Sequence, residues 1–255
     1  MKRILITLTA CLIGTFLVSG VAMAQSTSAV KGFDTCFNCF GQDPQQAWFT
    51  TEHADGYQLM VIDPDTWSSE FPDGNADDPG PASQCQLAAD SRQLIDSAIY
   101  AGMRVAIYNR NLNCWRQSLD SLGRLEKLGT PVYVWDVETQ PGLVPTRADV
   151  AAVTKMGYDN AVYSWDGAVR ANLSGFHMLP LFVTEVANWN TPGAGPSADF
   201  PATNSIAPFD GWTSAQMEQD STGQLNGIRV DFDAVNAAWL DGLRHGDAAS
   251  TVRWG

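Results

Sequence analysis

Two acidic residues near the middle of the chain have the types and the spacing for acid–base catalysis. Asp136 and Glu138 stand two apart at the end of an apolar stretch, in Trp135-Asp136-Val137-Glu138. Side chains two apart on a β-strand point to the same face. Neighbouring carboxylates cannot both ionise cheaply, so one of them keeps its proton. A protonated acid beside an ionised carboxylate can cleave a glycosidic bond; a loop-edge pair that caps a helix or binds a cation is the alternative.

Polar side chains also end other predicted strands, and most of them are carboxylates. They are Asp34, Asp63, Asn109, Glu185 and Asp231. In barrels of alternating strands and helices, the C-terminal ends of the strands meet at one rim, and this rim carries the functional residues. We therefore expect these side chains to converge with the central acidic pair, and Asp34 and Asp231 to be catalytic with it.

The elements that must position these residues alternate between strands and helices. Helices are predicted over Leu87–Ala101, Cys114–Leu128, Ala234–Leu243 and, after a capping box at Thr146–Asp149, up to Gly157. Strands are predicted over Lys31–Asp34, Tyr57–Ile62, Met103–Tyr108, Pro131–Val137, Asn160–Ser164, Leu179–Thr184, Ala215–Gln219 and Gly227–Phe232. This alternation predicts an α/β fold, a TIM-like (β/α)8 barrel.

The end of the predicted barrel departs from the regular pattern. Only Asp220–Asn226 separates the last two strands. Parallel neighbours need a crossover of a dozen or more residues, and this segment is too short to supply one. We therefore expect the last strands to be antiparallel and the barrel to be irregular there.

The N-terminal segment has the features of a secretory signal peptide. Lys2 and Arg3 precede an apolar run that ends at Ala22-Met23-Ala24. A basic start, an apolar centre and a small-residue cleavage site are typical of such peptides; an uncleaved membrane anchor is the alternative. We expect residues 1–24 to be removed and residues 25–255 to form a single barrel domain. The protein would then be secreted, periplasmic or in the cell envelope, without stable membrane insertion.

The cysteines that follow the expected cleavage site are Cys36, Cys39, Cys85 and Cys114. An even number in an exported chain favours two disulfides, with three possible pairings. Because these cysteines follow the first three strands, we favour bridges from Cys36 and Cys39 to Cys85 and Cys114. The C-x-x-C spacing is also found in redox and zinc sites. A zinc site would need a second such pair or paired histidines nearby, and the sequence has neither. We expect no metal and no cofactor.

The charge of the chain excludes several classes of partner. Fifteen Lys and Arg against 28 Asp and Glu give a formal charge of −13. Contacts to nucleic-acid phosphates and to anionic lipid need clustered Lys and Arg, so neither partner is expected. A polysaccharide bound by a monomer fits this composition. Flat apolar rings suit pyranose faces, so several tryptophans are candidates for stacking on sugars: Trp48, Trp67, Trp115, Trp135, Trp165, Trp189 and Trp212.

Several segments, in order along the chain, resemble the family 25 glycoside hydrolases, the lysozyme-type muramidases. Gly32-Phe33-Asp34 resembles that family's opening strand, and Trp135–Glu138 resembles its central acidic motif. Later segments similar to its fifth strand, sixth strand and ending are Tyr158–Trp165, Pro180–Glu185 and Met217–Asp231. The first strand and the cysteines also resemble glycoside-hydrolase-like domains of secreted bacterial proteins.

The resemblance implies an irregular barrel with lysozyme-like activity on peptidoglycan or a related N-acetylhexosamine polymer. It implies Glu138 as the general acid, and Asp136 as the carboxylate that orients the substrate's N-acetyl group. Asp34 and Asp231 match the other two active-site aspartates. Substrate contacts are expected from Asp63, Asn109, Trp135, Glu185, Trp189 and Gln219.

The sequence departs from the family's pattern after its first strand and at the end of its second. Thr35–Cys39 replaces the usual Val-Ser-aromatic segment, and Val61–Asp65 replaces a run similar to Lys-Ala-Ser-Glu-Gly. These changes affect positions that would contact a saccharide. A catalytically silent barrel that binds cell-envelope glycan is therefore the alternative function, and an exported structural or partner-binding domain is a third.

Overall fold

A closed barrel of eight strands in chain order forms the centre of the protein. The computed structural model describes residues 29–36, 46–75, 78–123, 125, 130–137, 144–165, 175–184, 209 and 211–243. The strands are β1 (Ala29–Cys36), β2 (Tyr57–Asp63), β3 (Arg104–Asn109), β4 (Val132–Asp136), β5 (Asp159–Ser164), β6 (Leu181–Thr184), β7 (Met217–Leu225) and β8 (Ile228–Asn236). The mixed α/β barrel predicted from the sequence is confirmed.

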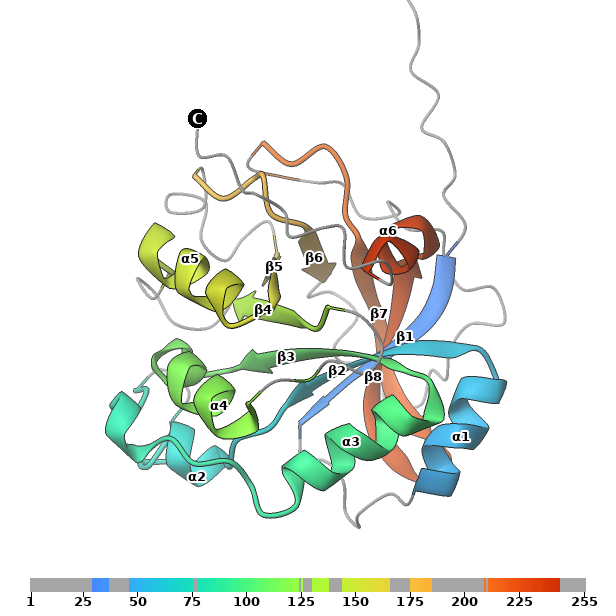
Figure 1. Ribbon diagram of the computed structural model, residues 1–255, viewed down its shortest axis with the longest axis horizontal. Coiled ribbons are helices and arrows are strands. Elements are labelled where there is room, and N and C mark those ends of the chain that lie inside the picture. The colour runs from blue at the N-terminus through green and yellow to red at the C-terminus, as the bar shows by residue number, and fades with distance from the viewer. Residues whose placement is uncertain are drawn as a thin grey trace, which may run out of the picture.

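Helices lie outside the strands (Figure 1). They are α1 (Gln46–Ala54), α2 (Trp67–Glu70), α3 (Ser91–Ala101), α4 (Trp115–Leu122), α5 (Arg147–Lys155) and α6 (Ala237–Gly242), with short 3-10 helices at Ala82–Gln84 and Leu112–Cys114. The predicted capping box is present at the start of α5. The sequence missed α1 and α2. In the described ranges, no helix has the length and apolar character needed to cross a membrane.

The direction of β8 makes the barrel irregular. Strands β1 to β7 run parallel to their neighbours. Strand β8 is antiparallel to both β7 and β1, and it closes the barrel between them. The predicted antiparallel ending is therefore confirmed, with the reversal confined to β8.

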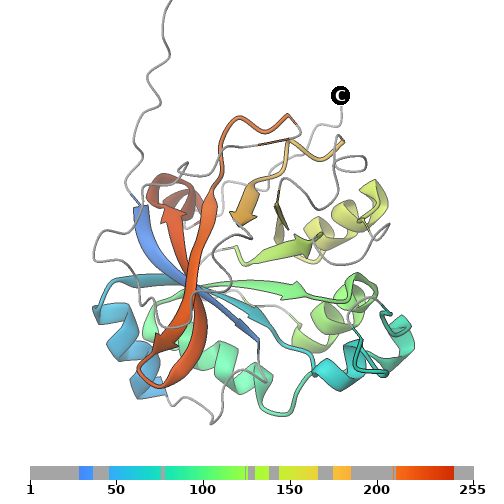
Figure 2. The same cartoon turned by 180° about the vertical axis from the view of Figure 1, so that it is seen from behind.

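A two-residue turn causes this reversal. Asn226 and Gly227 have φ angles of 45° and 87°, as a type I′ hairpin turn requires, and Asn-Gly is a preferred pair for it. The predicted loop over residues 220–226 is wrong, because β7 and β8 stay paired as far as Leu225 and Ile228. Polar residues dominate this part of β7, so its sequence lacks a strand-like apolar pattern. Figure 2 shows the hairpin as a long orange-red arm.

Alternation along the strands separates two hydrophobic cores. Val61, Val134 and Phe182 belong to the core inside the barrel. A second core, between the barrel and its helices, contains Tyr133 and Trp135. Because the two sets alternate along each strand, the residue that follows an interior side chain faces the helices. This alternation decides which strand-end side chains reach the functional rim.

The first strand needs a glycine where it meets the last. A Cβ atom on Gly32 would lie 2.8 Å from Val235 Cγ2 of β8. A larger residue would push β8 away from β1 and would open the barrel at this seam. Gly32 thereby allows the close pairing that brings Asp34 opposite Asp231.

Candidate active site

The strand ends surround a cleft that contains three of the expected catalytic residues. Asp34 of β1, Asp136 of β4 and Asp231 of β8 line one small cavity. An adjoining cavity of about 240 Å³ shares Asp34, Tyr108, Arg110 and Asp231 with it. We call the two together the rim cleft. Residues far apart in the sequence are thus brought to one place by the closure of the barrel.

The carboxylate of Asp231 is held by a chain of hydrogen bonds. Gln219 Nε2 donates to Asp231 Oδ2 at 3.1 Å, and the Tyr163 hydroxyl donates to Gln219 Oε1 at 2.5 Å. Burial raises the pKa of Asp231, while the positive charges of Arg229 and Arg110 act to lower it. The structure therefore places Gln219 in the cleft, where its amide orients an acidic residue.

The central acidic pair is described only in part. Asp136 is the last residue of β4, is buried, and lines the cleft. Glu138, Glu185, Trp189 and Cys39 lie outside the described residues. The placement of Glu138 beside Asp136, argued from the period of two along the strand, stays a prediction.

Three buried carboxyl groups lie at the end of β2 and in the segment after it. They belong to Asp63, Asp65 and Glu70, and the first two line the rim cleft. Asp65 Oδ2 accepts hydrogen bonds from Ser118 Oγ at 2.7 Å and from Asn109 Nδ2 at 3.2 Å. Burial, together with the negative charge of Asp63, raises the pKa of Asp65 to about 7. The cleft thus holds carboxyl groups that exchange protons between acidic and neutral pH.

Two of the expected substrate-binding residues lie away from the cleft. Trp135 is 1% exposed, and its indole Nε1 donates to Asn160 Oδ1 at 2.9 Å in the outer core. Asn109 is 0% exposed, and its Oδ1 accepts from the Tyr133 hydroxyl at 3.0 Å. Both occupy strand positions that face the helices, next to Asp136 and Tyr108, which face the cleft. The sequence indicated the right strand ends but the wrong side chains.

Two polar residues of the cleft, Tyr108 and Arg110, were not among the site residues expected from the sequence. Tyr108 and Arg110 flank Asn109 and line both cavities. Trp67 lines the larger cavity and is 40% exposed. Its ring packs against Phe71 with a centroid distance of 4.5 Å, and the Arg110 guanidinium lies 5.8 Å from its ring centre. Trp67 was one of several tryptophans considered for stacking on sugars, and it lies on a four-residue helix, α2, that the sequence did not predict.

The disulfide beside the cleft joins Cys85 to Cys114, with 5.3 Å between their Cα atoms. The favoured pairing of these two cysteines with the pair after β1 is therefore wrong. The segment before α3 folds back and forms backbone hydrogen bonds with residues 64–66, which carries Cys85 to the loop after β3. Cys36 is disulfide-bonded as well, and Cys39 lies outside the described residues.

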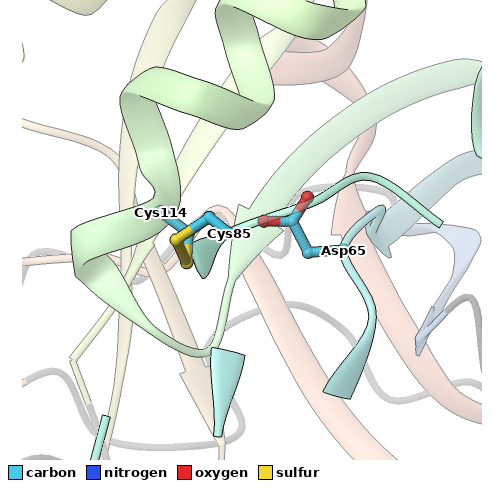
Figure 3. Close-up of side chains that lie close together, drawn as sticks. All are labelled: Asp65, Cys85 and Cys114. Atoms are coloured by element: carbon cyan, nitrogen blue, oxygen red, sulfur yellow. A yellow bond between two sulfur atoms is a disulfide. The ribbon is translucent and has the colours of Figure 1, made fainter. Parts of the chain in front are cut away.

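A carboxylate lies next to this disulfide (Figure 3). An oxygen of Asp65 and the sulfur atoms of Cys85 and Cys114 are within 4.8 Å of one another. Such a group could bind a metal ion only through thiolates, and here the sulfur atoms are bonded to each other. The arrangement therefore secures the loop after β2 rather than forming a metal centre.

Loss of the Cys85–Cys114 bridge should destabilise the protein. The bridge spans 29 residues, and closing a loop of this size stabilises a fold by about 3 kcal/mol. We expect the double variant Cys85→Ala, Cys114→Ala to lose about that much unfolding free energy, measured by urea denaturation. Under reducing conditions, the difference between variant and wild type should shrink. A double variant as stable as the wild type would show that the bridge does not constrain the fold.

The similarities between this chain and known proteins concern the fold alone. No family model and no curated protein matches the sequence. A muramidase from Acremonium alcalophilum is similar in structure, with 12% identity and a TM-score of 0.46 over 86% of this chain and 100% of that one. An uncharacterized protein from B. stearothermophilus has 14% identity and a TM-score of 0.45 over 84% of this chain and 99% of that one. A tryptophan synthase from M. tuberculosis gives 16% identity and a TM-score of 0.33, over 55% of this chain and 58% of that one.

Proposed function

We propose that this protein is a secreted glycoside hydrolase that cleaves peptidoglycan or a related N-acetylhexosamine polymer. The observation that carries the proposal is the convergence of Asp34, Asp136 and Asp231 on one cavity at the strand ends of the barrel. Buried carboxyl groups in a shared cleft titrate at different pH values, which lets one act as an acid while another stays ionised. This is the requirement of glycosidic bond cleavage.

The walls of the rim cleft suit a carbohydrate. Trp67 offers an exposed indole ring, and aromatic rings pack well against the apolar faces of sugars. Asp63 and Gln219 offer hydrogen-bond acceptors and donors for hydroxyl groups. Glu185 and Trp189 remain proposed contacts from the segment after β6. Asn109 and Trp135 are left out because both are buried behind the cleft.

The proposed reaction uses Glu138 and Asp136 in separate roles. Glu138 gives its proton to the glycosidic oxygen as the bond from that oxygen to the anomeric carbon breaks. The carbonyl oxygen of the substrate's N-acetyl group forms a bond to the anomeric carbon, and Asp136 accepts the N–H of the same group. Water then attacks the anomeric carbon, the bond from that carbon to the N-acetyl oxygen breaks, and the water gives a proton back to Glu138. Asp34 and Asp231 stabilise positive charge that develops on the sugar.

Export is part of the proposal. Disulfides persist in oxidising compartments, and the Cys85–Cys114 bridge supports such a location. The N-terminal segment has the pattern of a signal peptide, and we infer that the mature chain begins at Gln25. Residues 1–28 lie outside the described part of the structure.

The test is to incubate the mature protein with purified peptidoglycan and, separately, with oligosaccharides of N-acetylglucosamine. New reducing ends, identified by mass spectrometry, would support the proposal, and Asp136→Asn should lose most of this activity. Binding of glycan without cleavage would replace the hydrolase by the silent glycan-binding barrel. Neither cleavage nor binding would overturn both functions.

A further inference from the structure

A carboxyl group that no catalytic role requires lies directly behind the cleft. Glu70, the last residue of α2, is 0% exposed. Its backbone oxygen accepts from Asn111 Nδ2 at 2.9 Å and from the Gly80 N–H at 2.7 Å. These bonds hold the end of α2 against the loops that follow β2 and β3. The side chain is therefore fixed in place rather than free to turn toward solvent.

The two oxygens of the Glu70 carboxyl group have different surroundings. Oε1 accepts from the Asn111 backbone N–H at 3.3 Å. Oε2 is buried, and within the described part of the chain no N–H or hydroxyl group donates to it. The carboxyl group of Asp63 lies within hydrogen-bonding reach of this side chain. Two carboxyl groups can form a hydrogen bond with each other only if one of them carries the proton.

Burial raises the pKa of Asp63 as well, to about 6, but hydrogen bonds and a positive charge keep it below the pKa of Glu70. The proton therefore belongs to Glu70. The backbone N–H of Asp65 donates to Asp63 Oδ1 at 3.0 Å, and the backbone N–H and positive charge of Arg110 also favour its ionised form. Burial and the negative charges of Asp63 and Asp65 raise the pKa of Glu70 far above its ordinary range. Tyr108 and Tyr133 also face this group of carboxyls, and neither supplies a positive charge.

We propose that Glu70 is a positioning residue, a carboxylic acid that keeps its proton and donates it from Oε2 to Asp63. This bond occupies one side of the Asp63 carboxylate and leaves the rest of it facing the cleft, ready to accept hydrogen bonds from sugar hydroxyl groups. The contact between Asp63 and a sugar rests on the function proposed above. The protonated state of Glu70 does not.

Titration of the individual carboxyl groups tests whether Glu70 keeps its proton. Carbon-13 labelling of the Asp and Glu carboxyl groups allows each to be followed by NMR as pH changes. We expect the Glu70 signal to keep the shift of a protonated acid from pH 4 to pH 9. In Glu70→Met, which matches the length but has no donor, the pKa of Asp63 should rise by about one to two pH units. Glu70→Gln should restore it, because Asn111 holds Oε1 and leaves the amide nitrogen facing Asp63.

Two results would overturn the proposal. Glu70 could titrate in the range of an ordinary glutamate, or the methionine and glutamine variants could move the Asp63 titration equally, which is the behaviour of a packing residue. If the wild type cleaves N-acetylglucosamine oligosaccharides, Glu70→Met should raise KM about tenfold near pH 6, with little change in kcat. If it cleaves none, the function proposed above fails while the titration still decides the role of Glu70.

Discussion

Replacing Glu138 with glutamine should lower the rate of glycan hydrolysis by about 10²- to 10⁴-fold. Glutamine keeps the shape of the side chain but has no acidic proton to give to the leaving oxygen. Folding should change little, because a carboxylate beside the buried Asp136 gains little stability from its own charge. The rate should be measured from the reducing ends released over time, with thermal unfolding as the check on the fold.

A second variant distinguishes the role of the general acid from that of the neighbouring carboxylate. Asp136→Asn removes the carboxyl group that we propose lies beside Glu138, so the pKa of Glu138 should fall toward its ordinary value. A general acid works only while protonated, and the basic limb of the pH–rate profile should therefore move to lower pH. Asp120→Asn, at an exposed position on α4, is the matched control for a lost charge. Wild-type hydrolysis by Glu138→Gln would show that another group is the acid.

The free energy of unfolding should decrease as pH rises from about 4 to 8. Burial is the main reason that the pKa of Asp65 rises to about 7 and that of Asp159 to about 6, from 3.8 for an ordinary aspartate. Between pH 3.8 and these values the folded chain binds more protons than the unfolded chain, so stability is lost as pH rises. At about 1.4 kcal/mol for each pKa unit, Asp65 alone contributes on the order of 4 kcal/mol.

Urea denaturation at pH 5 and pH 8 measures this difference. Asp65→Asn should reduce the pH dependence by the share that Asp65 contributes, since an amide can still accept from Ser118 but has no charge to bury. The other buried carboxyl groups, Glu70 among them, keep the rest. Asp120→Asn changes the net charge by the same amount at an exposed position and should leave the pH dependence in place. Equal stability of the wild type at both pH values would mean that these carboxyls ionise in the folded protein without cost.

Local pattern was enough to predict much of the barrel. Apolar stretches of strand length, separated by helical sequence, located all eight strands, although the predicted seventh strand ended six residues before β7 does. The short connection before β8 predicted the reversal of that strand, which the Asn226–Gly227 turn produces. The capping box before α5 needed only its own four residues. These features depend on contacts between residues close in sequence, so they can be predicted from the sequence alone.

The sequence predicted which strand ends form the candidate site, but not which side chains at those ends face the cleft. Asp34 and Asp136 could be identified because each lies at or near the end of an apolar strand. Asp231 lies near the start of β8, and it reaches the same cavity because β8 runs antiparallel to β1. Alternation alone could not say which of two adjacent side chains faces inward. That is why Trp135 was expected in the cleft, whereas its neighbour Asp136 is the residue that lines it.

The amino-acid sequence by itself determined the order and direction of the strands and the convergence of carboxylates at one rim. Tertiary structure decided the pairing of Cys85 with Cys114, the burial of Asn109, and the contact between Glu70 and Asp63. Each of these depends on the path of a loop that is fixed by contacts with segments distant in sequence. Burial then sets the chemistry of the carboxyl groups, because the cost of ionising an acid depends on the solvent and charges around it. Those surroundings exist only once the chain has folded.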